Sequence, residues 1–276
     1  MRESHWRSIK EIVRHVMHVA GLGRLYRLVK ALRGNKTLHL LGNHDLESAF
    51  SNIYQLDVWR GHQGTSRSGP GSDLLAACEI IEPLKGLLVE LECTCLVDIG
   101  CGDFNWMQQV VARGTFRYIG CDIVRSIVDA NLARHQTERV TFRHLNACEE
   151  PIPFGDVIIC REVLFHLSLA DISRLIRNVK SSPAAYFIAT LDTSTWFNSN
   201  IQSGDFRHIN LLLKPFRFPI PLMAIPDFEG RTLAVWQVNQ IPTIPSSLDP
   251  GPVKSTNAKR LHGDHKTARA EKRDGI

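Results

Sequence analysis

The stretch LVDIGCGDFNW, residues 96–106, decides the fold of this chain. Its first residues are apolar, as in a buried strand, and Gly100 and Gly102 then follow one residue apart. Glycines at such a point let the backbone turn sharply into a helix and bring its N–H groups close to a ligand. The stretch therefore predicts a strand, a ligand-binding turn and a helix, in that order.

The chain on either side of this stretch continues the pattern of alternating strands and helices. Apolar runs predict strands over 95–100, 116–123, 140–147, 184–193 and 232–241, and a strand that runs into a turn over 156–167. Apolar residues at helical spacing predict helices over 73–90, 105–114, 124–135 and 169–182. Strands separated by helices of this length predict an α/β fold with a doubly wound, mostly parallel, Rossmann-like sheet.

Charge is distributed unevenly along the chain, whose net charge is +5. Residues 1–36 hold nine Lys or Arg and two Glu, and residues 252–276 hold seven Lys or Arg and three acidic residues. The part between them is therefore net acidic, which argues against a nucleic-acid groove. We predict a basic amphipathic helical extension over 1–45, a domain over 46–243 and a disordered basic tail over 244–276.

The N-terminal extension leaves two interpretations open. Its helices either pack on the domain with their charges in solvent, or make a weak contact with a membrane surface or a protein through residues 1–36. The sequence shows no signal peptide and no apolar run long enough to span a membrane. Its seven cysteines include no C-x-x-C pair, so we expect free thiols, no metal site and a cytoplasmic protein.

The glycine turn distinguishes between two nucleotide-like cofactors. A dinucleotide fingerprint needs a third glycine, but Asn105 stands there, and the charge of Asp103 would repel a pyrophosphate. S-adenosylmethionine has no phosphate and carries a cationic sulfonium and an ammonium, which suit acids on both sides of the glycines. Asp122, 20 residues after Gly102, stands at the end of the second strand, where it can accept hydrogen bonds from ribose hydroxyls. The alternative for Asp122 is a helix cap.

With these motifs in order, residues 96–192 resemble a class I S-adenosylmethionine-dependent methyltransferase, which implies a seven-stranded sheet. Residues 49–240 are similar to a group of bacterial methyltransferase-domain proteins, in the segments FSNIYQLDVW, SRSGPGSDL, DIGCGDFNWM, YIGCDIV, DVIICREVLFHLS and NSNIQSGDFRHINLLLKPFRFPIP. The chain departs from that group at four positions. Glu162 and Asn146 each stand where Asp is usual, and Phe206 and His208 stand where Trp and Pro are usual.

The strand ends and the resemblance together indicate the cofactor-binding residues. An amide at the end of the third strand can read the adenine amine. Trp59 and residues 66–72 either fold over the cofactor as a lid or belong to a flexible surface loop. The expected set is Trp59, Ser68, Asp98, Gly100, Cys101, Gly102, Asp103, Trp106, Asp122, Ile123, Asn146 and Ala147.

Candidate catalytic residues follow the fourth strand, namely Arg161, Glu162 and His166. A histidine there is either a base that removes a proton or a residue that shapes the strand end, and Arg161 either meets the substrate or forms a structural ion pair. Asp205, Arg207 and Asn210 are expected substrate-binding residues, because they are polar residues within an apolar stretch; a solvated loop is the alternative.

The sequence therefore predicts an enzyme that transfers a methyl group from S-adenosylmethionine to a small-molecule or glycan-linked acceptor, by in-line displacement. Two alternatives stay open. The fold is either a catalytically idle protein that binds S-adenosylmethionine or a partner, or a nucleic-acid methyltransferase that uses its basic ends. No segment that would stack on a flipped base is found in the sequence.

Overall fold

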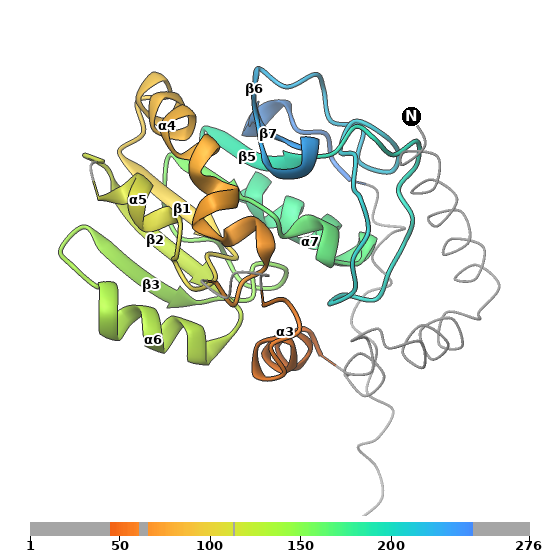
Figure 1. The fold of residues 1–276 in the computed structure, drawn as a ribbon. Helices are drawn as coiled ribbons and strands as arrows, with labels where there is room; N and C mark the ends of the chain where they lie inside the picture. Colours follow the sequence, from red (N-terminus) through yellow and green to blue (C-terminus); the bar gives the residue numbers. More distant parts are fainter. Residues whose placement is uncertain (1–44, 61–65, 113, 245–276) are drawn as a thin grey trace, which may run out of the picture.

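The computed structural model describes residues 45–60, 66–112 and 114–244 (Figure 1). The predicted extension over 1–45 and tail over 244–276 lie outside the described residues, except for one residue each. The described chain forms a sheet in the order β3-β2-β1-β4-β5-β7-β6. β1 to β5 are parallel, and β7 runs antiparallel to both of its neighbours, β5 and β6. The predicted doubly wound, mostly parallel, seven-stranded sheet is confirmed.

The central strands and helices occur where the sequence predicts them. The strands are β1 (Cys95–Ile99), β2 (Arg117–Asp122), β3 (Val140–His144), β4 (Val157–Cys160), β5 (Tyr186–Leu191), β6 (Met223–Pro226) and β7 (Thr232–Gln237). The helices are α3 (Leu46–Gln55), α4 (Leu74–Glu90), α5 (Met107–Val111), α6 (Arg125–His135) and α7 (Leu169–Ser181). Two elements, α3 and β6, were not predicted, because α3 is short and β6 contains alternating exposed residues and ends on a proline.

Each strand sends alternate side chains to opposite faces of the sheet, and each face has its own core. In β1, Val97 and Ile99 pack on the face covered by α3 and α7, whereas Leu96 packs on the face covered by α4 and α5. The helices therefore lie on both sides of the fanned strands (Figure 1). Because both faces are covered, the ligand site is left at the carboxyl ends of the strands.

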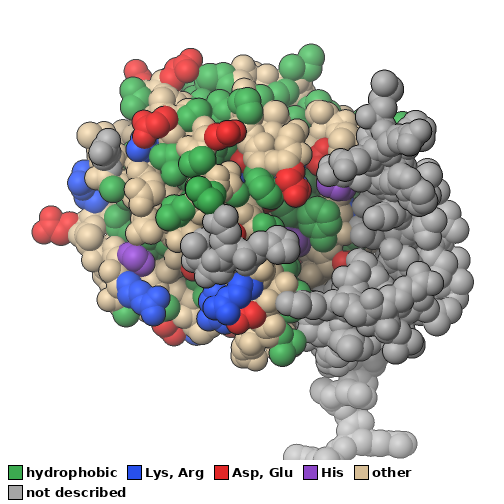
Figure 2. Space-filling view, in the orientation of Figure 1, with side chains coloured by type: hydrophobic (Ala, Val, Ile, Leu, Met, Phe, Trp, Pro, Cys, Tyr) green, Lys and Arg blue, Asp and Glu red, His purple; other side chains and the backbone are tan. Residues whose placement is uncertain are grey.

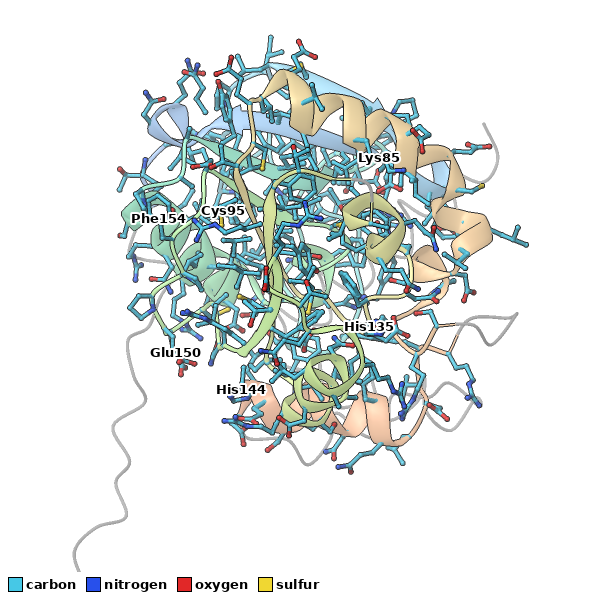
Figure 3. The ribbon with its side chains drawn as sticks, turned by 90° about the vertical axis from the view of Figure 1, so that its left-hand side faces the viewer. Lys85, Cys95, His135, His144, Glu150 and Phe154 are labelled. Carbon is cyan, nitrogen blue, oxygen red and sulfur yellow. The ribbon has the colours of Figure 1, made fainter. Side chains whose placement is uncertain are left out.

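α3 is fixed to that edge of the sheet by capping, packing and one polar contact. Asp45 caps its first turn by accepting a hydrogen bond from the backbone N–H of Ser48 at 2.7 Å. The side chains of Phe50 and Tyr54 are buried on its inner face. His144, at the end of β3, has its Nε2 3.1 Å from a carboxylate oxygen of Glu47, and Figure 3 shows His144 beside this helix.

The segment between β5 and β6, residues 192–222, has no regular helix or strand but contributes buried residues to the core. All seven cysteines are free. Among the described residues, no helix is long and apolar enough to cross a membrane. No group of three or more metal-ligating side chains occurs in the same part of the chain.

Candidate active site

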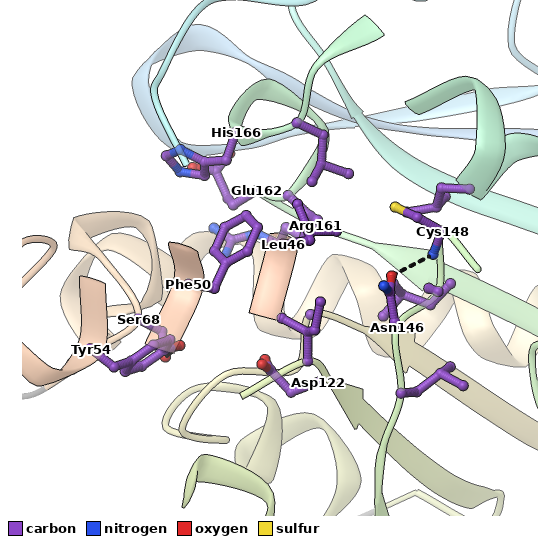
Figure 4. A pocket seen from close by; sticks show the side chains of 18 of the residues that line it. Leu46, Phe50, Tyr54, Ser68, Asp122, Asn146, Cys148, Arg161, Glu162 and His166 are labelled. Atoms are coloured by element: carbon purple, nitrogen blue, oxygen red, sulfur yellow. Dashed lines mark hydrogen bonds between the residues drawn. The ribbon is translucent and has the colours of Figure 1, made fainter. Parts of the chain in front are cut away.

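One pocket lies where the sequence analysis places the ligand, at the carboxyl ends of β1 to β4 (Figure 4). α3 and residues 68–72 cover it from the side opposite the strands. Ten of the predicted site residues line it: Trp59, Ser68, Gly100, Asp122, Ile123, Asn146, Ala147, Arg161, Glu162 and His166. The structure therefore brings most of the predicted cofactor residues and all three predicted catalytic residues to one cavity.

The glycine turn is built so that other residues do not fit in it. Gly100 has φ +73° and Gly102 has φ +56°, in the left-handed region that favours glycine. A Cβ on Gly100 would lie 2.4 Å from a methyl group of Val163, and one on Gly102 would lie 2.3 Å from Ser68 Oγ. The loop thus approaches both the residues after β4 and the covering segment more closely than a side chain allows.

Asp122 holds the end of β2 against the glycine turn. Its carboxylate accepts hydrogen bonds from the backbone N–H groups of Gly102 at 3.0 Å and Val124 at 2.9 Å. Burial raises the pKa of this carboxyl group, although the two backbone hydrogen bonds lower it. Each oxygen makes one of these bonds and keeps a further lone pair, so Asp122 can still accept hydrogen bonds from a ligand in the pocket.

The end of β3 forms an apolar wall with one amide. Ile123, Leu145 and Ala147 line the pocket there beside Asn146. The side-chain oxygen of Asn146 accepts a hydrogen bond from the N–H of Cys148 at 3.1 Å (Figure 4). The oxygen keeps a further lone pair, so Asn146 can still accept a hydrogen bond from the exocyclic amine of adenine, the contact that the sequence analysis expects.

Five of the predicted cofactor residues do not line the pocket; two of them, Cys101 and Gly102, lie in the turn itself, and Asp98, Asp103 and Trp106 support it. Asp98 is buried under it and accepts a hydrogen bond from Tyr118 Oη at 2.7 Å. Burial raises the pKa of Asp98 to about 7, against the lowering effect of that hydrogen bond. Cys101 is buried in the turn itself, and Trp106 is buried under the guanidinium of Arg161, which lies 4.6 Å from the ring centroid.

Asp103 ties the covering segment to the turn instead of contacting the pocket. Its carboxylate accepts hydrogen bonds from Ser66 Oγ and from the N–H of Arg67 at 2.8 Å, and its own N–H donates to Ser68 Oγ at 2.9 Å. Ser68 Oγ is in turn 2.8 Å from the hydroxyl of Tyr54. Residues 66–68 are therefore bonded to the glycine turn, as a cover over the cofactor pocket requires.

The side chains after β4 form the wall of the pocket nearest α3. Arg161 donates two hydrogen bonds to Asp227 and one to the carbonyl of Gly71. Glu162 has φ +62° and forms an ion pair with Arg231, with the closest atoms 3.0 Å apart. Burial raises the pKa of Glu162 to about 7. Of the interpretations left open for Arg161, the contacts favour the structural ion pair.

His166 stacks on Trp59, with the ring centroids 4.2 Å apart and the planes at 30°. Its Nδ1 donates a hydrogen bond to the carbonyl of Asp205 at 3.0 Å. Burial lowers the pKa of His166 to about 4, so the imidazole is neutral at pH 7. With Nδ1 carrying the proton, Nε2 is the ring atom that can accept a hydrogen bond or a proton.

The three predicted substrate-binding residues do not line this pocket. Arg207 is fully buried and donates to the carbonyls of Ser199, Leu164 and Leu167. The side chains of Asp205 and Asn210 accept hydrogen bonds from backbone N–H groups of their own segment. The bonds from Arg207 to Leu164 and Leu167 hold residues 192–222 against the loop after β4, whereas Asp205 and Asn210 shape their own segment.

His208 and Phe206, two of the departures from the resembling group, belong to the same wall. His208 Nδ1 lies 2.6 Å from a carboxylate oxygen of Asp192, at the end of β5. Burial of Asp192 would raise its pKa, but hydrogen bonds from His208 and Ser194 lower it to about 2. The Phe206 ring packs between the two imidazoles of His166 and His208.

Sequence reasoning missed the contribution of α3 to the site. Leu46, Phe50 and Tyr54 line the pocket, one or two helical turns apart. The signal that could have found them is the apolar spacing of residues 46–55, which the sequence analysis did not assign to a helix. Burial raises the pKa of Tyr54, so its hydroxyl stays protonated.

Comparisons with known proteins agree with this geometry. A family model described as a methyltransferase domain matches residues 96–182. The matched residues run from β1 to the end of α7 and are similar to a methyltransferase domain. No curated protein matches the chain. Among solved structures, PigF with S-adenosylhomocysteine (SAH) superposes with a TM-score of 0.51 at 16% identity, over 77% of this chain and 69% of that one.

Two further structures are similar to the chain around its methyltransferase domain. Human N-acetylserotonin methyltransferase with S-adenosylmethionine gives a TM-score of 0.48 at 13% identity, over 80% of this chain and 68% of that one. The methyltransferase domain of bacterial CtHen1 gives 0.38 at 15% identity, over 41% of this chain, which covers 65% of that domain structure. At these identities the likeness concerns the fold.

The residues that line the pocket fit S-adenosylmethionine, the predicted cofactor. The test is the chemistry of the lining, in which the backbone of Gly100 and the buried carboxylate of Asp122 face the same pocket. No phosphate-binding third glycine follows, since Asn105 donates its side-chain N–H to the carbonyl of Ser72 instead. Asp122 and Asn146, with apolar Ile123 and Leu145 beside them, would hold the nucleoside.

Proposed function

We propose that this protein transfers a methyl group from S-adenosylmethionine to a small-molecule or glycan-linked acceptor. One observation carries the proposal. The same pocket is lined by Gly100 and Asp122, whose carboxylate can bind ribose hydroxyls. It is also lined by Glu162 and His166, which can form hydrogen bonds with an acceptor. A protein that only stored the nucleoside would not need the second set of polar groups there.

The bound cofactor supplies an electrophilic methyl group, and its departure leaves a neutral thioether that keeps the electrons of the broken bond. The residues of this chain orient the acceptor toward the methyl group and keep the nucleophile away from water. Ser68, in the hydrogen-bonded cover of residues 66–68, and the ring of Trp59 line the pocket and would limit the access of water to a bound acceptor. A nucleophile held there keeps its reactivity because water does not shield it.

An acceptor that begins protonated must lose its proton when the new bond to carbon forms. His166 is neutral at pH 7 and presents Nε2, so it can accept a hydrogen bond from that acceptor. Its low pKa makes it a weak proton acceptor, and we assign it the role of orienting the nucleophile. A proton released in the reaction then passes to water as the pocket opens.

The surface of the domain supports a small acceptor over a nucleic acid. On the described part of the face drawn in Figure 2, Lys and Arg side chains lie among acidic ones and do not form one continuous basic surface. The charged residues that line the pocket are Asp122, Glu162 and Arg161, and Arg161 is already paired with Asp227. Among the described residues on this face, a polyanion would find no basic track leading into the site.

Titration calorimetry with S-adenosylmethionine and with SAH tests the cofactor. Both should bind, and absence of binding by both would refute the proposal. Incubation of the protein with radiolabelled S-adenosylmethionine and a small-molecule extract then tests transfer. Incorporation of label into a compound smaller than the protein is expected. Binding without any incorporation would favour the idle, cofactor-binding alternative.

A further inference from the structure

Glu162 is held in an unusual way at the end of β4. Its backbone has φ +62°, which a residue with a side chain rarely adopts, and its N–H donates to Thr190 Oγ1 at 2.8 Å. A Cβ on Gly71 would lie 2.9 Å from Glu162 Oε2, so the covering segment leaves room only for this carboxylate. Strain of this kind persists where the surroundings fix a residue for function.

Arg231 lies just before β7, in the C-terminal hairpin formed by β6 and β7, and it holds the Glu162 carboxylate from that side. Its Nη2 donates to Oε2 at 3.0 Å, and its Nε lies 3.0 Å from Oε1. The guanidinium is only 4% exposed, and it lies 5.4 Å and 5.3 Å from the ring centroids of Phe165 and Phe228. Two aromatic rings and a second carboxylate, Glu229, therefore fix where Arg231 can point.

The two carboxylate oxygens of Glu162 differ in what they can still bind. Oε1 is buried and forms an ion pair with Arg231 Nε at 3.0 Å, without a hydrogen bond of regular geometry. Oε2 accepts one hydrogen bond, from Arg231 Nη2, and keeps a further lone pair. Because Glu162 lines the pocket, a hydrogen-bond donor that enters the pocket is the partner that its carboxylate can still take.

The charges around Glu162 limit what that donor can be. Arg161 is occupied by Asp227 and the carbonyl of Gly71, and Arg231 is occupied by Glu162 and Glu229. Neither guanidinium is therefore available to an anionic group. An ionised Glu162 would repel a carboxylate or phosphate placed beside it, whereas an amine or a hydroxyl could donate a hydrogen bond to it.

We propose that Glu162 binds a hydrogen-bond donor of the acceptor, an amine or a hydroxyl, and that Arg231 is the positioning residue that holds this carboxylate in the pocket. The proposal rests on the proposed function and adds the chemical class of the acceptor. Arg231 does not touch the acceptor. It acts by fixing the orientation and charge of Glu162.

The pairing of Glu162 with Arg231 can be tested without substrate by measuring the pKa of Glu162. Carbon-13 NMR of protein labelled at its glutamate side chains follows the titration, and the Glu162→Gln variant identifies the Glu162 signal. Burial raises the pKa of Glu162 to about 7, while Arg231 and Arg161 lower it and Asp227 raises it. Arg231→Gln should therefore move the titration upward, and Arg231→Lys should keep it near the wild-type value. Arg134→Gln, an exposed arginine on α6, is the matched control and should change nothing.

Two results would overturn the assignment of Arg231. One is an Arg231→Gln variant in which the titration of Glu162 moves downward from the wild-type value. The other is a titration that Arg231→Gln leaves as unchanged as Arg134→Gln does. If Arg231→Gln does not fold, Arg231→Lys still tests the assignment. A pKa of Glu162 in the lysine variant that departs from the wild-type value would contradict a charge-based role for Arg231.

The acceptor class is tested on the labelled products of the extract incubation. Methyl groups on nitrogen or on a hydroxyl oxygen survive alkali, whereas methyl esters of carboxylates release labelled methanol. We expect alkali-stable label, and at least a tenfold loss of incorporation in Glu162→Gln with SAH binding retained. Alkali-labile label from a protein that binds SAH would overturn the acceptor class alone. Failure to bind SAH would instead overturn the proposed function.

Discussion

Replacing Asp122 by Asn tests the cofactor site most directly. The carboxylate accepts one hydrogen bond at each oxygen, from Gly102 and from Val124, and a ligand hydroxyl would add further bonds to a charged acceptor. Asn keeps the size of the side chain and one acceptor oxygen, but removes the charge. A hydrogen bond to a charged group contributes about 1.5–3 kcal/mol, so the variant should bind S-adenosylmethionine roughly 10- to 150-fold more weakly.

The assay is titration calorimetry with both S-adenosylmethionine and SAH, because the ribose is common to the two. Asp129→Asn is the matched control, since Asp129 is exposed on α6 and makes the same change of charge away from the pocket. Thermal unfolding of each variant shows whether the fold is kept. A folded Asp122→Asn protein that binds both ligands as tightly as Asp129→Asn does would refute the assignment of the ribose to Asp122.

Three further changes test the turn, the imidazole and the wall behind it. Gly100→Ala should destabilise the protein by about 1–3 kcal/mol in urea unfolding, because of its positive φ and the clash beyond it, whereas Gly86→Ala, in the exposed middle of α4 with nothing within 4 Å, should be neutral or stabilising. His166→Asn should slow methyl transfer more than it weakens SAH binding; an equal effect on both would contradict an acceptor-facing role. Because the folded pKa of His166 lies below the unfolded value, the protein should lose stability as pH falls from about 6.5 to about 4, and His166→Asn should reduce that loss in thermal unfolding. Arg207→Met should destabilise by about 3 kcal/mol or more by leaving buried carbonyls unbonded, and a mild effect would show that the segment rearranges.

The order and type of the central elements could be predicted from the sequence because the signals are local. A strand buried on both faces needs a continuous apolar run, as in residues 157–160, and a covering helix needs one apolar face, as in residues 169–181. β6 was missed for the opposite reason, because its residues are ordered by what they pack against and its one neighbouring strand is β7.

The candidate site divides in the same way. Gly100 and Asp122 could be placed from sequence because each stands at the end of a parallel strand, and such ends meet at one edge of the sheet. Arg207 could not, since its polar character predicts a ligand contact, while its burial and its bonds to backbone carbonyls make it part of the wall. A polar side chain in an apolar segment gives the same sequence pattern whether it contacts a ligand or bonds to buried backbone carbonyls.

By itself, therefore, the sequence determined the parallel sheet, the glycine turn and the acids that flank it, all of which depend on neighbours a few residues apart. Only the tertiary structure decided which side chains face the pocket. It brought Arg231 from the C-terminal hairpin onto Glu162, and it brought Tyr54 and Ser68 onto the glycine turn. These contacts join residues that are distant in the chain, and no local pattern records which of the possible partners the packed core will select.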